Sequence, residues 1–551
     1  MADAHSQRMR DSLRTHRPLS DSALLQAASS LNRGPRRWDA VIVGSGFGGA
    51  MVAHRLIEAG AKVLMIERGD WVERGESAWR PDGSLEMTEH YSRESEYRCL
   101  SGGHGPRIGG YSCVGGPSVF YGCVAFRFRE QDFVGDSDII ADSQAAWPFR
   151  YSDLEPYYGD AERLLSIAGD DRHDPTAPTR SSPYPQPPAA WSALSSRLAD
   201  GARSLGLSPF SLPLAQNHVA SENRSTCVAC RNCDSFACAI EAKNDVDSMM
   251  IKPLLRRGLT LWPRTVAVRF EHAGRRITKL QVFCKDNGEA LSIEADLFIV
   301  AAGALGTPHL ILSSKLDEVC PAGSIIGKYL IRHNNAMVFG VFPSAPDKEY
   351  RFHKQVAIHD YYFGDKSAPD AKGLSKLGGV QQVMTPPHDL VRAHLPLGTK
   401  SVLGAFTENL TGLLCIAEDQ PQRDNGVFVD FSVRDIFGLP QLVVQHRYTN
   451  RDKRALAVLA RRAKRVLRKT GAWFSYTHQV RTFSHVLGTV RMGIDPQTSP
   501  LDENGKMRGI DNLWVADGSA LPLSAGVNPS LTISANALRI ADSIVSEMSR
   551  G

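Results

Sequence analysis

The sequence Ala40-Val41-Ile42-Val43-Gly44-Ser45-Gly46-Phe47-Gly48-Gly49 decides the fold class of this 551-residue chain. Its first four residues are apolar, as in a strand buried within a parallel sheet. We expect a helix over 50–59, ended by Gly60, and a second buried strand over 63–66 that leads to Glu67. The order strand, glycine turn, helix, strand and acidic residue predicts a Rossmann-like unit that binds a dinucleotide.

Each glycine of the Gly44-x-Gly46-x-x-Gly49 motif has a physical role in such a unit. The first permits a tight turn, the second lets main-chain N–H groups approach a pyrophosphate, and the third lets helix and strand pack closely. The helix N-terminus adds partial positive charge. A carboxylate at Glu67 can bind a ribose diol and would repel a 2′-phosphate, which disfavours NADP; the motif alone does not separate FAD from NAD. The predicted cofactor contacts here are Gly44, Ser45, Gly46, Phe47, Gly48, Gly49, Glu67 and Arg68.

The composition is that of a globular protein. Hydrophobic residues make up 42% of the chain, and 64 basic against 59 acidic residues give a formal net charge of 64 − 59 = +5. Because this charge is spread along the sequence, we expect no nucleic-acid or membrane partner. No stretch approaches the ~18–20 apolar residues that span a bilayer. Residues 1–37 lack the apolar core of a secretory signal, so we expect an N-terminal extension and a cytoplasmic protein.

Four of the ten cysteines form the motif Cys227-x2-Cys230-x2-Cys233-x4-Cys238. Its two-residue spacings are similar to a ferredoxin-type iron–sulfur motif, although the last spacing is longer and no proline follows. Three alternatives stay open: a [3Fe-4S] or [4Fe-4S] cluster, a structural zinc ion, and uncoordinated thiols or a disulfide. A cluster would favour a dehydrogenase with a protein or quinone acceptor, whereas zinc would leave oxygen as the acceptor.

Several motifs resemble, in order, those of the glucose–methanol–choline (GMC) family of FAD-dependent oxidoreductases. Residues 115–118 and 121–122 (Gly-Gly-Pro-Ser and Tyr-Gly) are similar to the first family signature, and residues 303–314 to the second. The most specific block is C-terminal and comprises residues 485–489, 491–493, 515–519 and 528–532. The cysteine motif resembles a segment that binds an iron–sulfur cluster in some bacterial sugar dehydrogenases of this family.

The sequence also departs from the family pattern. Pro117 and Tyr121 replace residues that are common in the first signature, and Lys315 replaces a glycine in the second. The glycine-rich loop contains His104, but no histidine lies within 115–122, where some members attach the flavin covalently. The resemblance therefore implies non-covalent FAD.

The resemblance implies an α/β fold in which a Rossmann-like FAD-binding domain is interleaved with an α+β substrate domain that carries an antiparallel sheet. This is a fold like that of p-hydroxybenzoate hydroxylase. The expected limits are 1–37 for the extension, 38–165, 241–326 and 481–551 for the FAD-binding domain, and 166–240 and 327–480 for the substrate domain. Further implied cofactor contacts are Gly115, Gly116, Ser118, Tyr121, Gly122, Val266, Ala302, Gly303, Asp517, Gly518, Asn528, Pro529 and Ser530.

His485 is the histidine that lies in the family's catalytic motif. Oxidation of an alcohol needs a base near neutral pH, which suits imidazole, and the resemblance gives Asn528 as its partner. Two plainer interpretations stay open: His485 as a buried structural histidine, and Asn528-Pro529 as the N-cap and first turn of a helix. His333, His446 and His478 are alternative bases.

The resulting hypothesis is FAD-dependent oxidation of a CH–OH group by hydride transfer to flavin N5, with His485 as base. The polar 327–480 region favours a small polar alcohol such as a sugar, an amino sugar or an aminoglycoside. Acidic residues that could bind a cationic substrate are Asp360, Asp365, Glu408, Glu418 and Asp419. The electron acceptor would be oxygen, a redox protein or a quinone. Alternatives are a lyase of the same fold with structural FAD, and a non-catalytic metal-containing binding protein.

Overall fold

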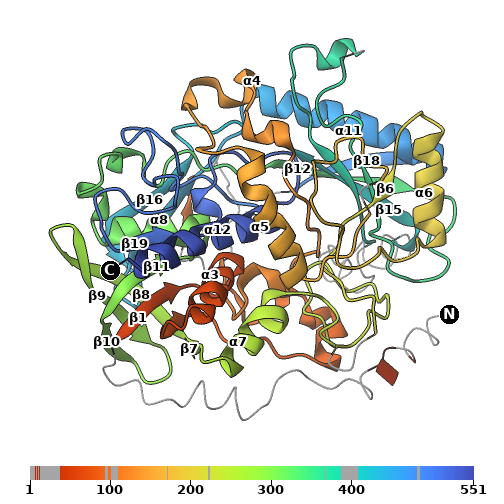
Figure 1. The fold of residues 1–551 in the computed structure, drawn as a ribbon. Helices are drawn as coiled ribbons and strands as arrows, with labels where there is room; N and C mark the ends of the chain where they lie inside the picture. Colours follow the sequence, from red (N-terminus) through yellow and green to blue (C-terminus); the bar gives the residue numbers. More distant parts are fainter. Residues whose placement is uncertain are drawn as a thin grey trace.

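A computed structural model describes residues 37–92, 97–100, 110–170, 172–220, 224–366, 368–385, 407–480 and 484–550, together with Gln7, Met9, Asp11 and Ser12. The described residues form a parallel sheet, a larger antiparallel sheet and several small sheets, with helices packed on both main sheets (Figure 1). Among the helices in this part of the chain, none combines the length and apolar character that a membrane crossing needs.

The parallel sheet has the strand order β19-β11-β1-β2-β7. Its strands are β1 (Trp38–Val43), β2 (Val63–Ile66), β7 (Thr260–Trp262), β11 (Ala295–Val300) and β19 (Leu513–Val515). These apolar strands are almost entirely buried, as expected for a parallel sheet covered on both faces. Helix α12 (Ser530–Met548) packs against α3 (Phe47–Glu58) and α5 (Tyr151–Leu164), as Figure 1 shows. The predicted α/β fold with a Rossmann-like unit is confirmed.

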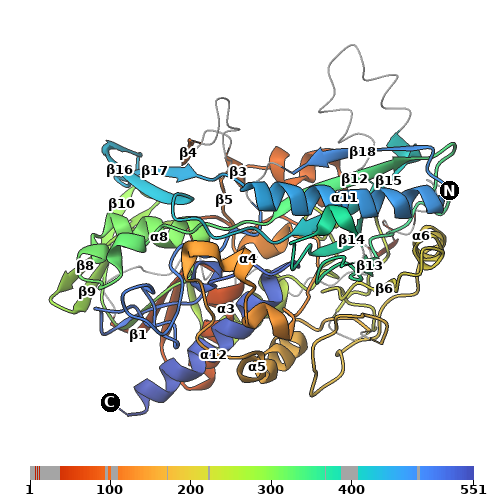
Figure 2. The same cartoon turned by 90° about the horizontal axis from the view of Figure 1, so that it is seen from above.

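The antiparallel sheet has the strand order β18-β12-β15-β14-β13-β6. Its strands are β6 (Phe210–Ser211), β12 (Asn334–Val341), β13 (Val356–Ile358), β14 (Gly379–Val383), β15 (Leu410–Ala417) and β18 (Phe474–Gln479). Helix α11 (Asn450–Thr470) runs along β12, β15 and β18 (Figure 2), and α6 (Ala193–Arg203) packs against it. The domain limits given above stay a prediction.

Smaller elements complete the described fold. One small sheet holds β8 (Thr265–Ala273), β9 (Arg276–Cys284) and β10 (Glu289–Ile293), another β4 (Tyr97–Cys99), β16 (Gly426–Arg434) and β17 (Pro440–Gln445), and a third β3 (Tyr91–Ser92) and β5 (Gly110–Tyr111). The remaining helices are α4 (Ser137–Ile140), α7 (Lys252–Arg256) and α8 (Gly303–Ser313), with a π-helical turn over Asp247–Ile251.

Helix α11 lies within the expected substrate-domain segment 327–480, for which no helix was predicted. Its N-terminus is a capping box, in which Thr449 Oγ1 accepts the Asp452 N–H at 3.1 Å and the Asp452 carboxylate accepts the Thr449 N–H at 2.9 Å. Its C-terminus is Gly471, in the left-handed region with φ +108°. Both signals stand in the sequence, and they outweigh the strand-forming residues on either side.

A buried ion triad joins three segments that are far apart in the sequence, at Asp132, Lys376 and Glu418. Lys376 Nζ lies 2.6 Å from Asp132 Oδ1 and 2.6 Å from Glu418 Oε2. Burial acts to lower the pKa of Lys376, but the two carboxylates prevail and raise it. Glu418 Oε1 also accepts the Ala525 N–H at 2.9 Å. The triad therefore fixes the segment 524–526, which precedes the predicted Asn528 site.

Replacement of Lys376 by Met should destabilise the protein by about 3–5 kcal/mol, because two buried carboxylates would lose their only lysine. The measurement is the urea dependence of tryptophan fluorescence. Lys372→Met, on the same segment but exposed, is the control and should leave the unfolding midpoint unchanged. An equal midpoint for both variants would contradict a stabilising role for the triad.

Candidate active site

The glycine turn packs directly on the ends of two neighbouring strands. A Cβ on Gly48 would lie 1.7 Å from the carbonyl oxygen of Ala516, and one on Gly44 (φ +101°) 2.4 Å from that of Ala301. A Cβ on Gly46, in contrast, would meet its nearest atom at 3.7 Å. Helix α3 begins directly afterwards, and no side chain caps its first N–H groups. The turn thus leaves open space beside uncapped N–H donors, which fits a pyrophosphate.

Glu67 lies at the end of β2 and closes this turn. Its Oε2 accepts the N–H and the hydroxyl of Ser45 at 3.1 and 2.7 Å, and its Oε1 accepts the Gly69 N–H at 2.8 Å. The carboxylate is buried. It therefore orders the turn itself, in addition to any contact with a ribose.

Two further predicted contacts, Arg68 and Val266, lie beside Glu67. The Arg68 guanidinium sits 5.7 Å from the centre of the Phe437 ring. Val266 is buried on β8, next to Thr265, whose N–H donates to the Glu67 carbonyl at 2.8 Å.

The loop 115–122 folds over the glycine turn. The Gly115 N–H donates to Ser45 Oγ at 3.0 Å, and the Tyr121 ring packs edge-on against Phe47 with ring centres 5.5 Å apart. The Ser118 hydroxyl donates to the Gly115 carbonyl at 2.7 Å. The two glycine motifs, seventy residues apart in sequence, thus form one cradle, in which a Cβ on Gly116 would lie 3.0 Å from Gly46 Cα. A Cβ on Gly122 would instead meet the side chains of Asp234 and Lys354.

Asp517 connects the second signature with the C-terminal block. Its Oδ2 accepts the Gly303 N–H at 2.9 Å, and its Oδ1 accepts the Ser519 N–H at 2.8 Å. Burial raises the pKa of Asp517. Ala302 precedes the first turn of α8, and Gly518 packs on the segment that follows His485.

The structure brings His485, His333 and Asn528 together. His485 Nδ1 lies 3.0 Å from His333 Nδ1, and His485 Nε2 lies 3.3 Å from Asn528 Nδ2. The Oδ1 atom of Asn528 is buried and has no hydrogen-bond partner in the described structure. A buried, unsatisfied amide oxygen is costly unless a ligand completes it, so this position fits a bound substrate or cofactor.

Burial lowers the pKa of His485 well below its ordinary value. His333 and the positive charges of Lys354 and Arg332 act in the same direction. The imidazole is therefore uncharged at neutral pH and able to accept a proton.

Helix α12 starts one residue later than expected. Pro529 is its N-cap, no side chain caps the helix, and Ser530 is its first residue. The interpretation of Asn528 as N-cap is therefore wrong, because the Asn528 side chain points instead at His485. The Ser530 hydroxyl donates to the Val124 carbonyl at 3.3 Å.

The other alternative bases have different surroundings. His446 Nε2 lies 3.3 Å from Asp419 Oδ2, and His478 is exposed on the edge strand β18. Of the three alternatives, His333 is the one in hydrogen-bond contact with His485.

The predicted metal site is not formed by the described side chains. Across the described ranges, no group of three or more His, Cys, Asp or Glu residues is arranged to hold a metal ion. All four cysteines of the motif (Cys227, Cys230, Cys233 and Cys238) are free thiols. The iron–sulfur cluster and the zinc ion thus stay predictions without geometric support.

The thiols form hydrogen bonds instead. Cys123 and then Cys230 hydrogen-bond to Cys233 and lower the pKa of the Cys233 thiol well below its ordinary value. Gln216 Nε2 lies 3.3 Å from Cys233 Sγ. Cys123 lies outside the motif and follows Gly122 of the flavin signature, so sequence spacing gave no signal for this contact.

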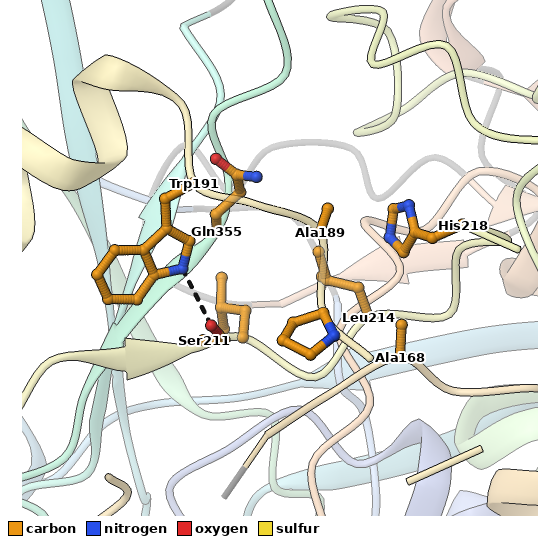
Figure 3. Close-up of a pocket in the computed structure, with 9 residues that line it drawn as sticks. Ala168, Ala189, Trp191, Ser211, Leu214, His218 and Gln355 are labelled. Atoms are coloured by element: carbon orange, nitrogen blue, oxygen red, sulfur yellow. Dashed lines mark hydrogen bonds between the residues drawn. The ribbon is translucent and has the colours of Figure 1, made fainter. Parts of the chain in front are cut away.

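A small pocket lies elsewhere (Figure 3). It is lined by Ala168, by residues from 188–191 and 211–218, and by Gln355. Its lining includes His218 and Trp191, whose Nε1–H donates to Ser211 Oγ at 3.0 Å. It has room for about one water molecule and contains none of the predicted site residues.

Known proteins give the family of this chain. Residues 142–335 and 421–537 match the two GMC oxidoreductase models, and residues 39–96 match an FAD-binding domain. Paromamine 6'-oxidase of Streptomyces fradiae is 30% identical over 536 residues, which cover 93% of this chain and 92% of that protein. A 6'''-hydroxyparomomycin C oxidase of Streptomyces lividus is 29% identical with the same coverage of both chains.

A solved structure agrees in fold. Pyridoxine 4-oxidase from Mesorbium loti superimposes with a TM-score of 0.64 at 17% identity, over 94% of this chain and 100% of that chain. The chain belongs to the GMC oxidoreductase family. It is an FAD-dependent alcohol oxidase or dehydrogenase.

The contrast between Gly48 and Gly46 gives a prediction. Gly48→Ala should lower the stability of the cofactor-free protein by about 3 kcal/mol or more, because its Cβ overlaps main-chain atoms. Gly46→Ala should leave that stability unchanged, because its Cβ would make only an ordinary contact of 3.7 Å with Pro117. It should weaken FAD binding, because the methyl group would stand beside the space proposed for the pyrophosphate. Thermal unfolding of apoprotein and FAD titration by fluorescence quenching measure the two effects; equal stability losses would contradict the assignment.

Proposed function

We propose that His485 and Asn528 form the catalytic pair of this oxidoreductase, with His485 as the base. The observation that carries the proposal is the contact of His485 Nε2 with Asn528 Nδ2 at 3.3 Å, beside an Asn528 oxygen that has no partner among the described residues. In this role His485 takes the hydroxyl proton of the alcohol, while the Asn528 amide orients the alcohol oxygen. When bound, FAD supplies the acceptor for the hydride that leaves the carbon.

The proposed residues that hold FAD are those of the cradle. The N–H groups of Gly46 and of the first turn of α3, which no side chain caps, would face the pyrophosphate, and Glu67 would lie by the ribose. The uncapped N-terminus of α12, at Ser530, adds partial positive charge at the other end of the cradle, which favours negative charge nearby. Non-covalent attachment of FAD is part of the proposal.

The proposed substrate is a polar alcohol, and within that class an amino sugar or aminoglycoside. Its support is the 29–30% identity, over more than nine-tenths of both chains, to two oxidases named for such compounds. Glu418 and Asp419 are not free to bind a cationic substrate, because both are buried and hold main-chain N–H groups. Cation recognition is therefore left to other side chains of the substrate domain.

The proposed electron acceptor depends on the cysteine segment. If the segment holds no cluster, the acceptor is oxygen; if it holds an iron–sulfur cluster, the acceptor is a redox protein or a quinone. Lys354 Nζ lies 2.6 Å from Asp234 Oδ1 within the cysteine segment, and the charge of Lys354 also disfavours the His485 cation, which supports a segment near the candidate active site. Side-chain rearrangement around iron would be needed, because the thiols are hydrogen-bonded to one another. The location proposed for the protein is the cytoplasm.

Anaerobic addition of substrate should bleach the flavin absorbance of the purified protein. His485→Ala should slow bleaching by at least about 100-fold, and Asn528→Ala should also slow it, while both retain FAD. His478→Ala, exposed on β18, is the matched control and should bleach at the normal rate. Product formation without bleaching would favour the lyase alternative. The absence of both product and bleaching would favour the binding-protein alternative.

Anaerobically purified protein should contain iron and acid-labile sulfide if the cysteine segment holds a cluster. Cys230→Ser should then remove the iron, while Cys415→Ser, a buried cysteine on β15, should not. Protein that has full flavin and neither iron nor zinc would contradict both metal predictions.

A further inference from the structure

A row of hydrogen-bonded groups leads from the Ser524 carbonyl through two imidazoles to Asn528. His333 Nε2 lies 2.8 Å from Ser524 O, His333 Nδ1 lies 3.0 Å from His485 Nδ1, and His485 Nε2 lies 3.3 Å from Asn528 Nδ2. Each of the four ring nitrogens therefore has a polar neighbour within this row, and the Ala525 main chain is a further partner of His333. The position of each hydrogen follows from what that neighbour can donate or accept.

The hydrogens can be assigned from one end of the row. A carbonyl oxygen only accepts, so His333 Nε2 carries a hydrogen. Burial lowers the pKa of His333, which keeps the ring neutral with a single hydrogen. His333 Nδ1 is then an acceptor, and the hydrogen between the two rings belongs to His485 Nδ1. A neutral His485 in that state has its lone pair on Nε2, toward Asn528.

We propose that His333 is a positioning residue that fixes the tautomer of His485, so that Nε2 is the atom that accepts the substrate proton. The inference rests on the proposed role of His485 as base. Without an acceptor at Nδ1, the ring hydrogen is free to move to Nε2. The ring would then present a donor to the substrate hydroxyl and could not take its proton.

The backbone at both histidines supports a positioning role. His333 has φ +59° and His485 has φ +58°, in the left-handed region, which is unfavourable for a non-glycine residue. Surrounding groups hold His333 in place: Asp419 Oδ1 accepts its N–H at 3.0 Å, and the Tyr448 hydroxyl donates to its carbonyl at 2.7 Å. Such strain persists only where the surroundings determine the conformation.

Charged groups face the pair from several elements. The positive charges of Lys354 and Arg332 act on His485 and disfavour its cation. The negative charges of Asp419 and Asp132 act on His333 and favour its cation, but the effect of burial is larger. Both rings are therefore neutral, which is the state that the assignment of hydrogens requires.

The test uses two variants of nearly equal shape, His333→Leu and His333→Asn, in the FAD-loaded enzyme. Nitrogen NMR of histidine-labelled protein should find the Nδ1–H form of His485 in the wild type and a shift toward the Nε2–H form in His333→Leu. The rate of flavin reduction in His333→Leu should fall at least about 100-fold with KM little changed. His333→Asn, whose Oδ1 can replace Nδ1 as acceptor, should recover most of the rate and the Nδ1–H form.

His309→Leu is the matched control, because it also removes a buried histidine bonded to a carbonyl, that of Pro440 at 2.7 Å. It should leave the His485 signals unchanged. An Nε2–H form of His485 in the wild type would overturn the proposal. So would an equal loss of the flavin reduction rate in His333→Leu and His333→Asn. The tautomer is measured by NMR without turnover, so this test is independent of the proposed function. The proposed function fails if the His485→Ala variant still reduces the flavin.

Discussion

Two adjacent carboxylates at the end of β15 hold together the segments that carry the candidate active site. Glu418 accepts the Ala525 N–H at 2.9 Å, and Asp419 accepts the N–H groups of Arg332 and His333, each at 3.0 Å. A buried carboxylate is stable only when charges and hydrogen bonds replace water. Lys376 supplies that replacement for Glu418. At Asp419 burial opposes ionisation, but the hydrogen bond with His446 and the main-chain N–H of Arg332 prevail and lower the pKa. The main chain at His333 and next to Ser524, at one end of the histidine row, is therefore fixed by one pair of side chains.

This arrangement connects the two main sheets. The carboxylates follow a strand of the antiparallel sheet, whereas Ala525 belongs to the loop between β19 of the parallel sheet and α12. The cradle for FAD, in turn, is built from the ends of β1, β2, β11 and β19, joined by Asp517 and Glu67. The proposed proton transfer and the proposed cofactor binding thus depend on different sheets, which meet at the segment 524–530.

The sequence sufficed for the parallel sheet because its signals are local. The glycine turn and the apolar runs at β1 and β2 were predicted, and the resemblance brought His485 and Asn528 to one site. The contacts of His333 and Cys123 were not predicted, because they join segments more than one hundred residues apart. Helix α11 was not predicted, although its capping-box residues and Gly471 can be recognised in the sequence. The cysteine spacing indicated a metal, but spacing does not determine where thiols point.

The parallel sheet is assembled from widely separated parts of the chain. Strand β11 lies between β1 and β19, and Phe298 pairs with Leu513, which is 513 − 298 = 215 positions later. Pairings of such high sequence separation are slow to form. During synthesis, the N-terminal strands leave the ribosome long before their last partner exists. The nucleotide cradle, which needs Ala516 against Gly48, can therefore close only after residue 516 has been synthesised, and flavin loading follows that step.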